Sequence, residues 1–224
     1  MTHRTLERIL SGGIIPVVRA PSSELADRAV EALCKGGIDV IELTLTVPGA
    51  VSMIRTLTDR FGDSVVVGAG TVLDAETARA CILAGASFIV SPIVDRPTIA
   101  CCRTYGVVVM PGALTPTEIM DAVRAGADLV KVFPCGALGG ASYVRSLRAP
   151  FPQVKLVPTG GVSLKTAGDF IRAGACAVGV GADLVDIGRI TSGRGGEITE
   201  NARAYVEAIR GAREREDMSQ PMAT

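Results

Sequence analysis

Several residue types that enzymes often use are scarce in this sequence. Its 224 residues include no tryptophan and one histidine, His3, and aromatic residues make up 4% of the chain. The sequence therefore lacks the histidines that a His-based metal site, a Ser-His-Asp triad or a Cys-His dyad requires. The 6 cysteines include no Cys-x-x-Cys pair, which indicates reduced, buried thiols. We expect neither a metal ion nor a cofactor.

Charge of one sign is also lacking. The 23 basic and 23 acidic residues balance, and they are scattered along the chain. A nucleic-acid binder needs a basic stripe that this sequence does not have. No apolar run reaches the roughly 18 residues of a membrane span, and residues 1–8 lack the apolar core of a signal peptide. We expect a cytoplasmic protein that binds neither nucleic acid nor a membrane.

What the sequence does contain is a series of short, apolar, β-branched runs. Hydrophobic residues make up 48% of the chain, which is enough for one large core. The runs are almost continuously apolar, as is typical of parallel strands that are covered on both faces. The eight expected strands are residues 14–18, 40–45, 65–67, 88–90, 107–110, 129–133, 155–157 and 177–180.

Amphipathic segments between these runs predict helices, and their ends carry repeated signals. Gly126 and Gly174 each stand just beyond a helical segment, where the left-handed backbone conformation favours glycine. Thr115 and Glu118 have the spacing of a capping box at a helix start. The clearest expected helices are residues 22–34, 74–84, 115–125 and 164–173.

The alternation of strands and helices predicts an α/β fold with a parallel sheet. Eight strand-helix units closed into a (β/α)8 TIM barrel fit the length, as a single domain over residues 1–212. An open, doubly wound sheet is the competing topology. Residues 192–196 are expected to form a loop, residues 197–212 a last helix, and residues 213–224 a disordered tail.

Lys131 differs from the other three lysines, because it alone lies in the middle of an apolar strand. An inward-facing lysine loses hydration, which favours the neutral amine that attacks carbonyl groups. Glu42 occupies the same kind of place in an earlier strand, and together they suggest a base beside an amine. The alternatives are an outward Lys131 whose ammonium reaches solvent and a structural ion pair without chemistry.

Glycine-rich turns follow several of the expected strands. Residues 68–71 follow the third strand and offer backbone N–H groups and the hydroxyl of Thr71 to a ligand. Arg19 ends the first strand, and its planar guanidinium group suits a carboxylate or phosphate. The alternatives are glycines that only turn the chain and a solvated loop arginine. Two further turns stand where barrels commonly bind phosphate through backbone N–H groups: Thr159, Gly160 and Gly161 after the seventh strand, and Gly181 and Ala182 after the eighth.

The motifs around these residues resemble those of the 2-keto-3-deoxy-6-phosphogluconate (KDPG) aldolases and their 4-hydroxy-2-oxoglutarate (KHG) and phosphogalactonate relatives. The resemblance runs from the first expected strand to the last helix, and its motifs occur in one order. They are residues 17–20 (VVRA), 41–48 (IELTLTVP), 68–72 (GAGTV), 89–92 (IVSP), 110–112 (MPG), 131–134 (KVFP) and 158–162 (PTGGV).

This resemblance implies a class I aldolase that cleaves KDPG, or a close 2-keto-3-deoxy sugar acid, to pyruvate and glyceraldehyde 3-phosphate. It implies that Lys131 forms a Schiff base and that Glu42 acts as general acid and base. It also implies a homotrimer whose other partners are small molecules. The substrate-binding residues that it implies are Pro92 and Phe133 around the pocket, Thr71 and Arg19 at the carboxylate, and Thr159, Gly160, Gly161, Gly181 and Ala182 at the distal phosphate.

The sequence departs from the family pattern in two places. Many members have arginine where this chain has Thr46, so the carboxylate role passes to Arg19. Ala182 replaces a common serine, which weakens the expected preference for phosphate. The gluconate and galactonate epimers are not distinguished by these residues. Two rival functions also stay open, a phosphosugar isomerase, epimerase or decarboxylase on the same barrel and a sugar-phosphate binding protein without catalysis.

Overall fold

The computed structural model describes residues 2–219, which alternate between strands and helices. All strand pairs among these residues are parallel. The strands are β1 (Ile14–Val18), β2 (Val40–Thr44), β3 (Val66–Gly70), β4 (Phe88–Val90), β5 (Val108–Met110), β6 (Gly112–Ala113), β7 (Val130–Val132), β8 (Leu156–Pro158) and β9 (Val178–Val180). The α-helices are α1 (Thr2–Gly12), α2 (Ser23–Lys35), α3 (Ala50–Phe61), α4 (Ala75–Leu83), α5 (Arg96–Tyr105), α6 (Pro116–Ala125), α7 (Ala141–Arg148), α8 (Ala167–Arg172), α9 (Ile187–Thr191) and α10 (Gly195–Ser219), and the 3-10 helices are η1 (Gly62–Ser64) and η2 (Gly136–Leu138).

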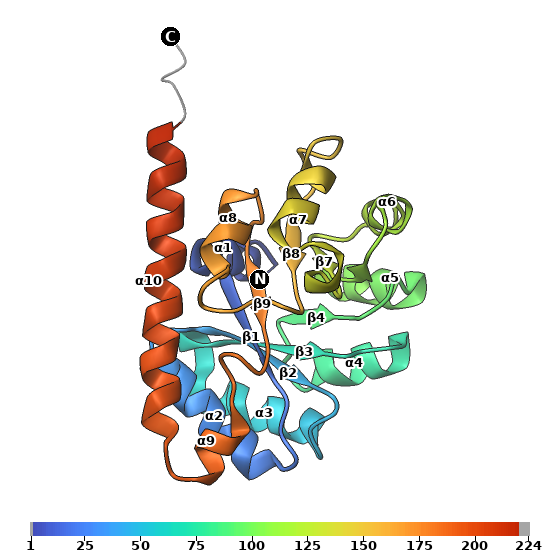
Figure 1. Cartoon of the computed structure of the whole chain (residues 1–224). Coiled ribbons are helices and arrows are strands. Elements are labelled where there is room, and N and C mark those ends of the chain that lie inside the picture. The colour runs from blue at the N-terminus through green and yellow to red at the C-terminus, as the bar shows by residue number, and fades with distance from the viewer. Residues whose placement is uncertain (1, 220–224) are drawn as a thin grey trace.

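The strands form two sheets. One has six strands in the order β5-β4-β3-β2-β1-β9, and the other has three in the order β6-β7-β8. The larger sheet curves into a half-barrel with helices packed around it (Figure 1). The predicted α/β fold with a parallel sheet is confirmed.

Backbone contacts join the two sheets at both edges. An isolated parallel bridge between Thr159 and Gly179 connects the end of β8 to β9. At the other edge, Pro111 separates β5 from β6, and its carbonyl oxygen accepts a 2.9 Å hydrogen bond from the backbone N–H of Lys131. The sequence predicts no strand at β6, because two residues are too few to show a periodicity.

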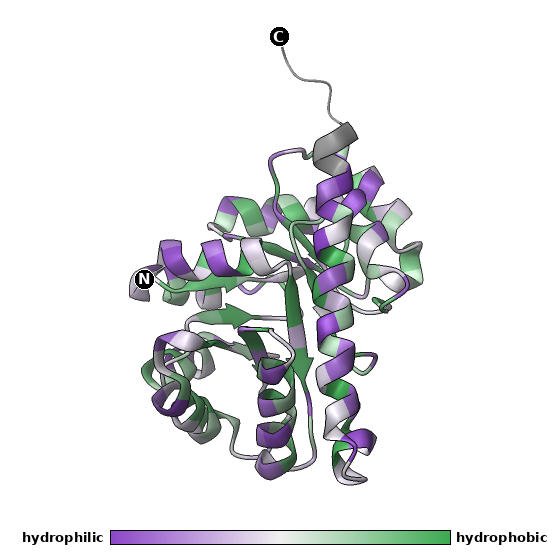
Figure 2. Ribbon diagram, turned by 90° about the vertical axis from the view of Figure 1, so that its left-hand side faces the viewer, coloured by the Kyte–Doolittle hydropathy of each residue, from purple (hydrophilic) through white to green (hydrophobic). Residues whose placement is uncertain are grey.

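The two faces of the strands belong to two different apolar clusters. Ile41 and Leu43 of β2 pack in the larger cluster with the surrounding helices, as do Val130 and Val132 of β7. The hydropathy colouring shows the strands as an apolar layer inside the molecule (Figure 2). The smaller cluster, called here the inner cluster, gathers Ile9, Ile15, Val40, Val66, Phe88, Val90, Val108, Met110, Leu129, Val157 and Ala177 from α1 and both sheets.

Helix ends follow the signals expected from the sequence. The capping box of Thr115 and Glu118 is present at the start of α6, and Gly126 adopts a left-handed φ of 99° at its end. The side chains of Asp74 and Asp95 accept hydrogen bonds from backbone N–H groups at the starts of α4 and α5. These side chains satisfy helix donors that have no partner within the helix.

The first and last of the described helices differ from expectation. Helix α1, which the sequence analysis did not predict, buries Thr5 and Ile9. Helix α10 does not end at Ala212 but continues to Ser219. Its Arg213 donates a 2.7 Å hydrogen bond to the carbonyl of Leu10 and a 3.1 Å bond to that of Cys176. These contacts account for the longer helix, and residues 220–224 of the expected tail lie outside the described residues.

Candidate active site

Glu42 and Lys131 face each other across the space between the two sheets. Each stands between two residues of the larger cluster, so the alternation of side chains along a strand turns it to the opposite, inner face. Lys131 is 7% exposed and Glu42 is 2% exposed. The Nζ atom of Lys131 lies 3.6 Å from Oε1 of Glu42. The structure thus brings together the two ionisable residues singled out from the sequence.

This pair is not a closed, fully bonded ion pair. Among residues 2–219, Oε1 of Glu42 is buried without a hydrogen-bond partner. A buried carboxylate oxygen without a partner is costly, and native proteins usually place a water or a ligand there. The geometry places an acceptor of Glu42 that has no protein hydrogen-bond partner among residues 2–219 beside the amine of Lys131.

Gly70 provides the space in which the carboxylate lies. A Cβ atom at this position would come within 2.1 Å of Oε1 of Glu42. Strand register places Thr44 of β2 opposite Gly70 of β3, two residues beyond the Glu42–Gly68 pair. The Glu42 side chain therefore extends along the strand direction, over Gly70 and toward the carboxyl ends of the strands.

Phe133 lies beside Lys131, and together with Pro92 it lines a cavity whose lining includes neither Lys131 nor Glu42. The ring centre of Phe133 is 5.3 Å from Nζ of Lys131. Phe133 is 38% exposed, so one face of the ring remains open to solvent. Phe133, Pro92 and Gly112 line a cavity of about 520 Å³ that also reaches Arg96. Pro92 packs tightly there, since a Cβ at Gly112 would come within 2.4 Å of its backbone.

Cys135 follows Phe133 and is buried, but it is not an activated nucleophile. Burial raises the pKa of its thiol to about 11, so the thiol stays protonated near neutral pH. Near neutral pH this thiol is therefore not a thiolate nucleophile.

Thr44 is a residue of this region that the sequence analysis did not assign. Its buried hydroxyl donates a 3.0 Å hydrogen bond to the carbonyl of Val18. The hydroxyl of Thr46 lies 2.7 Å from the same oxygen of Thr44. Because Thr44 has given its one proton to Val18, Thr46 must be the donor in that second bond. The pair fixes the end of β1 to the end of β2, and its sequence signal is a polar residue two positions after Glu42.

Arg19 and Thr71 stand at the ends of β1 and β3, the two strands that flank β2. Arg19 directly follows Val18, is exposed, and makes no ion pair with any residue of the described chain. Thr71 has a φ of 61°, a left-handed conformation that costs a β-branched residue energy and occurs mainly where function or packing enforces it. Both follow the carboxyl ends of their strands, which is the end toward which the Glu42 side chain points.

The two predicted anion-binding turns lie side by side. The bridge between Thr159 and Gly179 holds the strands that precede them together. Gly160 and Gly161 adopt left-handed φ angles of 83° and 79°. Four backbone N–H groups of these turns donate to no backbone carbonyl among residues 2–219. They belong to Gly160, Gly161, Gly181 and Ala182. Backbone N–H groups without a protein acceptor are the kind of donor that binds a phosphate, and both turns provide them.

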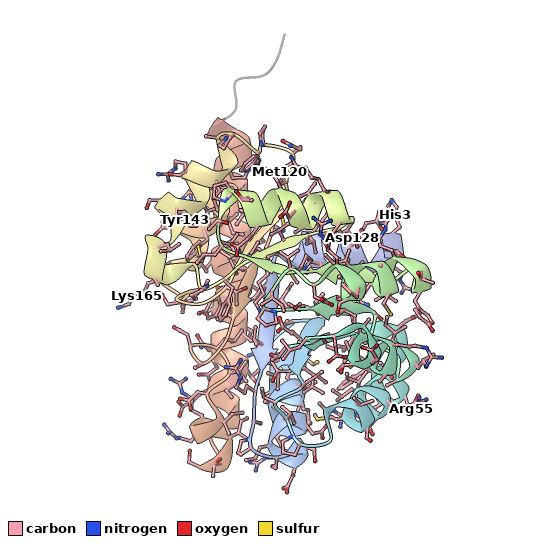
Figure 3. All side chains as sticks on the ribbon, turned by 90° about the vertical axis from the view of Figure 1, so that its right-hand side faces the viewer. His3, Arg55, Met120, Asp128, Tyr143 and Lys165 are labelled. Carbon is pink, nitrogen blue, oxygen red and sulfur yellow. The ribbon has the colours of Figure 1, made fainter. Side chains whose placement is uncertain are left out.

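The sole histidine and the lysine of residue 165 lie away from these candidates. Lys165 points away from the molecule at its edge, and so does His3 (Figure 3). The carboxylate of Glu7 contacts Nδ1 of His3 at 3.0 Å, with both side chains largely exposed. Throughout the described chain, no three His, Cys, Asp or Glu side chains gather in an arrangement suited to a metal ion. Nor does any helix of residues 2–219 combine the length and apolarity needed to cross a bilayer.

Comparison with known proteins gives a consistent result across sequence and structure. The sequence profile named KDPG and KHG aldolase matches residues 6–201. The 2-dehydro-3-deoxy-phosphogluconate aldolase of Treponema pallidum is 36% identical over 207 residues, which cover 91% of this chain and 95% of that protein. The 2-dehydro-3-deoxy-6-phosphogalactonate aldolase of Escherichia coli is 32% identical over 197 residues, covering 88% and 96%.

A solved structure shares the fold as well. The KDPG aldolase of Legionella pneumophila, with pyruvate captured as a covalent carbinolamine intermediate, superposes with a TM-score of 0.83 at 31% identity. The match covers 90% of this chain and 97% of that one. The similarity therefore extends over nearly the whole length of both chains.

Proposed function

Because this chain belongs to the KDPG and KHG aldolase family, we propose that it cleaves KDPG to pyruvate and glyceraldehyde 3-phosphate through a Schiff base on Lys131. The observation that carries this proposal is the buried pair of Lys131 and Glu42, with 3.6 Å between Nζ and Oε1 and no other hydrogen-bond partner for that oxygen in the described chain. A carbon-carbon lyase of this kind needs an amine and a base on one substrate.

The reaction begins when the neutral amine of Lys131 attacks the C2 carbonyl of the substrate. Loss of water then gives a protonated imine, which draws electrons from the neighbouring carbon-carbon bond. Phe133 packs beside the amine and excludes water from one side of it. The position of Lys131 supports this role, because its amine lies between the Glu42 carboxylate and the Phe133 ring on the inner face of β7.

Bond cleavage needs a base for the proton of the C4 hydroxyl. Glu42, directly or through a water, takes that proton, the C3–C4 bond breaks, and its electron pair moves to the imine to form an enamine. The aldehyde leaves. The protonated Glu42 returns a proton to C3 of the enamine, and hydrolysis of the resulting imine releases pyruvate and restores Lys131.

Binding groups at the strand ends hold the two charged ends of the substrate. Arg19 and the hydroxyl of Thr71 bind the pyruvyl carboxylate. The free N–H groups of Gly160, Gly161, Gly181 and Ala182 bind the distal phosphate, with Thr159 beside them. The strained φ of Thr71 supports its assignment, since strain of this kind is concentrated at binding sites.

The two sheets close into a single (β/α)8 barrel in this proposal. The Thr159–Gly179 bridge, the Lys131–Pro111 hydrogen bond and the inner cluster shared by both sheets support closure. Self-association as a homotrimer would cover exposed apolar side chains such as Leu73 and Ile93, and light scattering during gel filtration tests the trimer. A cytoplasmic location stays a prediction.

Trapping with borohydride tests the Schiff base directly. Pyruvate and borohydride should convert Lys131 into a stable secondary amine, which peptide mapping of the unchanged chain locates. Lys131→Met should give no adduct, whereas Lys155→Met, a lysine entering another strand, should give a normal one. An adduct on a different lysine, or none in the unchanged chain, would overturn the assignment.

The galactonate epimer is a second candidate substrate, because the E. coli phosphogalactonate aldolase is a close relative. The two epimers differ at one hydroxyl, which a pocket distinguishes by hydrogen bonding. Pyruvate release from both phosphates and from 4-hydroxy-2-oxoglutarate, compared as kcat/KM, decides which substrate the site prefers.

A further inference from the structure

The turn after β9, residues 181–183, has little packing behind it. Ala182 and Asp183 are exposed, and a Cβ at Gly181 would meet no atom within 4 Å. Behind the turn lies a cavity of about 720 Å³, whose lining includes Asp183 from the turn and Asn201 and Ala204 from α10. Side-chain packing therefore does not hold this turn in place.

Hydrogen bonds hold it instead, at both ends. The carbonyl of Gly181 accepts from the backbone N–H groups of Leu184 at 3.1 Å and Val185 at 2.9 Å. The carbonyl of Asp183 accepts a 2.8 Å hydrogen bond from Nδ2 of Asn201. Between these two fixed carbonyls lies the N–H group of Ala182, which donates to no backbone carbonyl of the described chain.

A second residue of α10 also faces the turn. Tyr205 lies one helical turn after Asn201 and is fully buried. Burial raises the pKa of its hydroxyl, and the nearby carboxylate of Asp183 raises it further. The hydrogen bond from Asn201 thus joins α10 to the turn, although the helix lies on the outside of the strands (Figure 1).

We infer that Asn201 is a positioning residue for phosphate recognition, acting through the turn of residues 181–183. It touches no substrate. By fixing the carbonyl of Asp183 it orients the peptide groups whose N–H atoms face the phosphate, so α10 sets the affinity for phosphorylated substrates. The inference rests on the proposed function, because it assumes that this turn binds the distal phosphate.

The test compares two isosteric variants on one helix. Asn201→Leu removes the bond to Asp183, and Thr199→Val removes a similar bond, in which the Thr199 hydroxyl donates at 2.9 Å to the carbonyl of Ala32 in α2. Each variant loses one hydrogen bond from α10 to a backbone carbonyl, but only the first bond leads to the turn. Melting temperatures of the two variants show whether their stabilities are matched.

Pyruvate release is measured with KDPG and with 4-hydroxy-2-oxoglutarate, which carries no phosphate. Asn201→Leu should raise KM for KDPG about fivefold to tenfold, the effect expected of one hydrogen bond, with kcat nearly unchanged. Its kcat/KM for 4-hydroxy-2-oxoglutarate should stay within about twofold of the unchanged chain, and competitive inhibition by inorganic phosphate should weaken. Thr199→Val should alter none of these.

Each other outcome has a definite meaning. If the unchanged chain is not inhibited by phosphate and does not prefer KDPG, the proposed phosphate site is wrong. If it is inhibited, but Asn201→Leu behaves like Thr199→Val or weakens both substrates equally, Asn201 does not position the turn. If Asn201→Leu fails to fold, Asn201→Ser, which also lacks the long amide donor, must show the same split between substrates.

Discussion

The two ends of the strands differ in what fills the space between them. At the carboxyl ends lie most of the buried polar side chains of residues 2–219, including Glu42, Thr44, Lys131 and Thr159. At the amino ends the same space holds apolar side chains of the inner cluster such as Val40, Val66 and Leu129, closed by Ile9 of α1. The two ends therefore contribute differently. Apolar packing at the amino ends stabilises the fold and offsets the cost of burying unbonded polar groups at the carboxyl ends.

Among variants that test the difference between the two ends, Glu42→Gln is expected to have the largest effect on kcat. Glutamine keeps the shape of glutamate but cannot take the C4 proton, so kcat should fall by about 10²–10⁴-fold. Thr5→Val, which changes a buried polar residue at the amino end, should leave kcat unchanged. Steady-state pyruvate release measures both, and equal losses in the two variants would mean that the ends do not differ as described.

Gly70→Ala should have the next largest effect. The added methyl group would occupy the space of the Glu42 carboxylate, and displacing a catalytic group by about 1 Å can cost on the order of 10²-fold in rate. Gly12→Ala is the matched control, because a Cβ there meets nothing within 4 Å. Normal turnover in Gly70→Ala would show that the carboxylate has room to move without loss of function.

Ile9→Ala tests the amino end by stability rather than rate. Truncating this fully buried side chain should lower the free energy of unfolding by about 2–4 kcal/mol, through lost transfer energy and a residual cavity. Turnover per folded molecule should stay the same. Urea denaturation and kcat measured on the same preparation check both parts, and a fall in kcat without a loss of stability would contradict the separation of roles.

The smallest effect is expected at Glu118, which lies outside both ends. Hydrogen bonds from the backbone N–H groups of Thr115 and Leu114 and from the Thr115 hydroxyl lower its pKa below the ordinary 4.5. A lowered folded pKa means that the contribution to stability is complete above pH 4.5 and is lost as pH falls through the lower folded value. Glu118→Gln should therefore flatten the acid side of the stability curve, measured as melting temperature against pH.

The strand pattern and the central pair could be predicted from the sequence. Strands β1 and β4 coincide with the expected ranges, and the other predicted strands differ from the structure by a few residues. Lys131 and Glu42 were identifiable because an ionisable residue inside an apolar strand is conspicuous. These signals are local, since a strand and its unusual residue can be read within a few positions of the chain.

Features that depend on distant contacts could not be predicted. Helix α1 is a short segment, and its apolar residues are buried only by strands that lie far along the chain. The space at Gly70 is visible only when β2 and β3 are in register. The bond from Asn201 to Asp183 joins a helix to a turn 18 residues earlier, and no periodicity in the sequence marks it.

The position of α1 has a consequence for how the chain is made. Its Ile9 packs in a cluster that includes Leu129, Val157 and Ala177, and its last carbonyls accept hydrogen bonds from Arg213. During synthesis α1 leaves the ribosome before the strands against which it packs, and its docking site is complete only after Ala177 and Arg213 have emerged. An early-made segment that must wait for its partners keeps its apolar face exposed meanwhile.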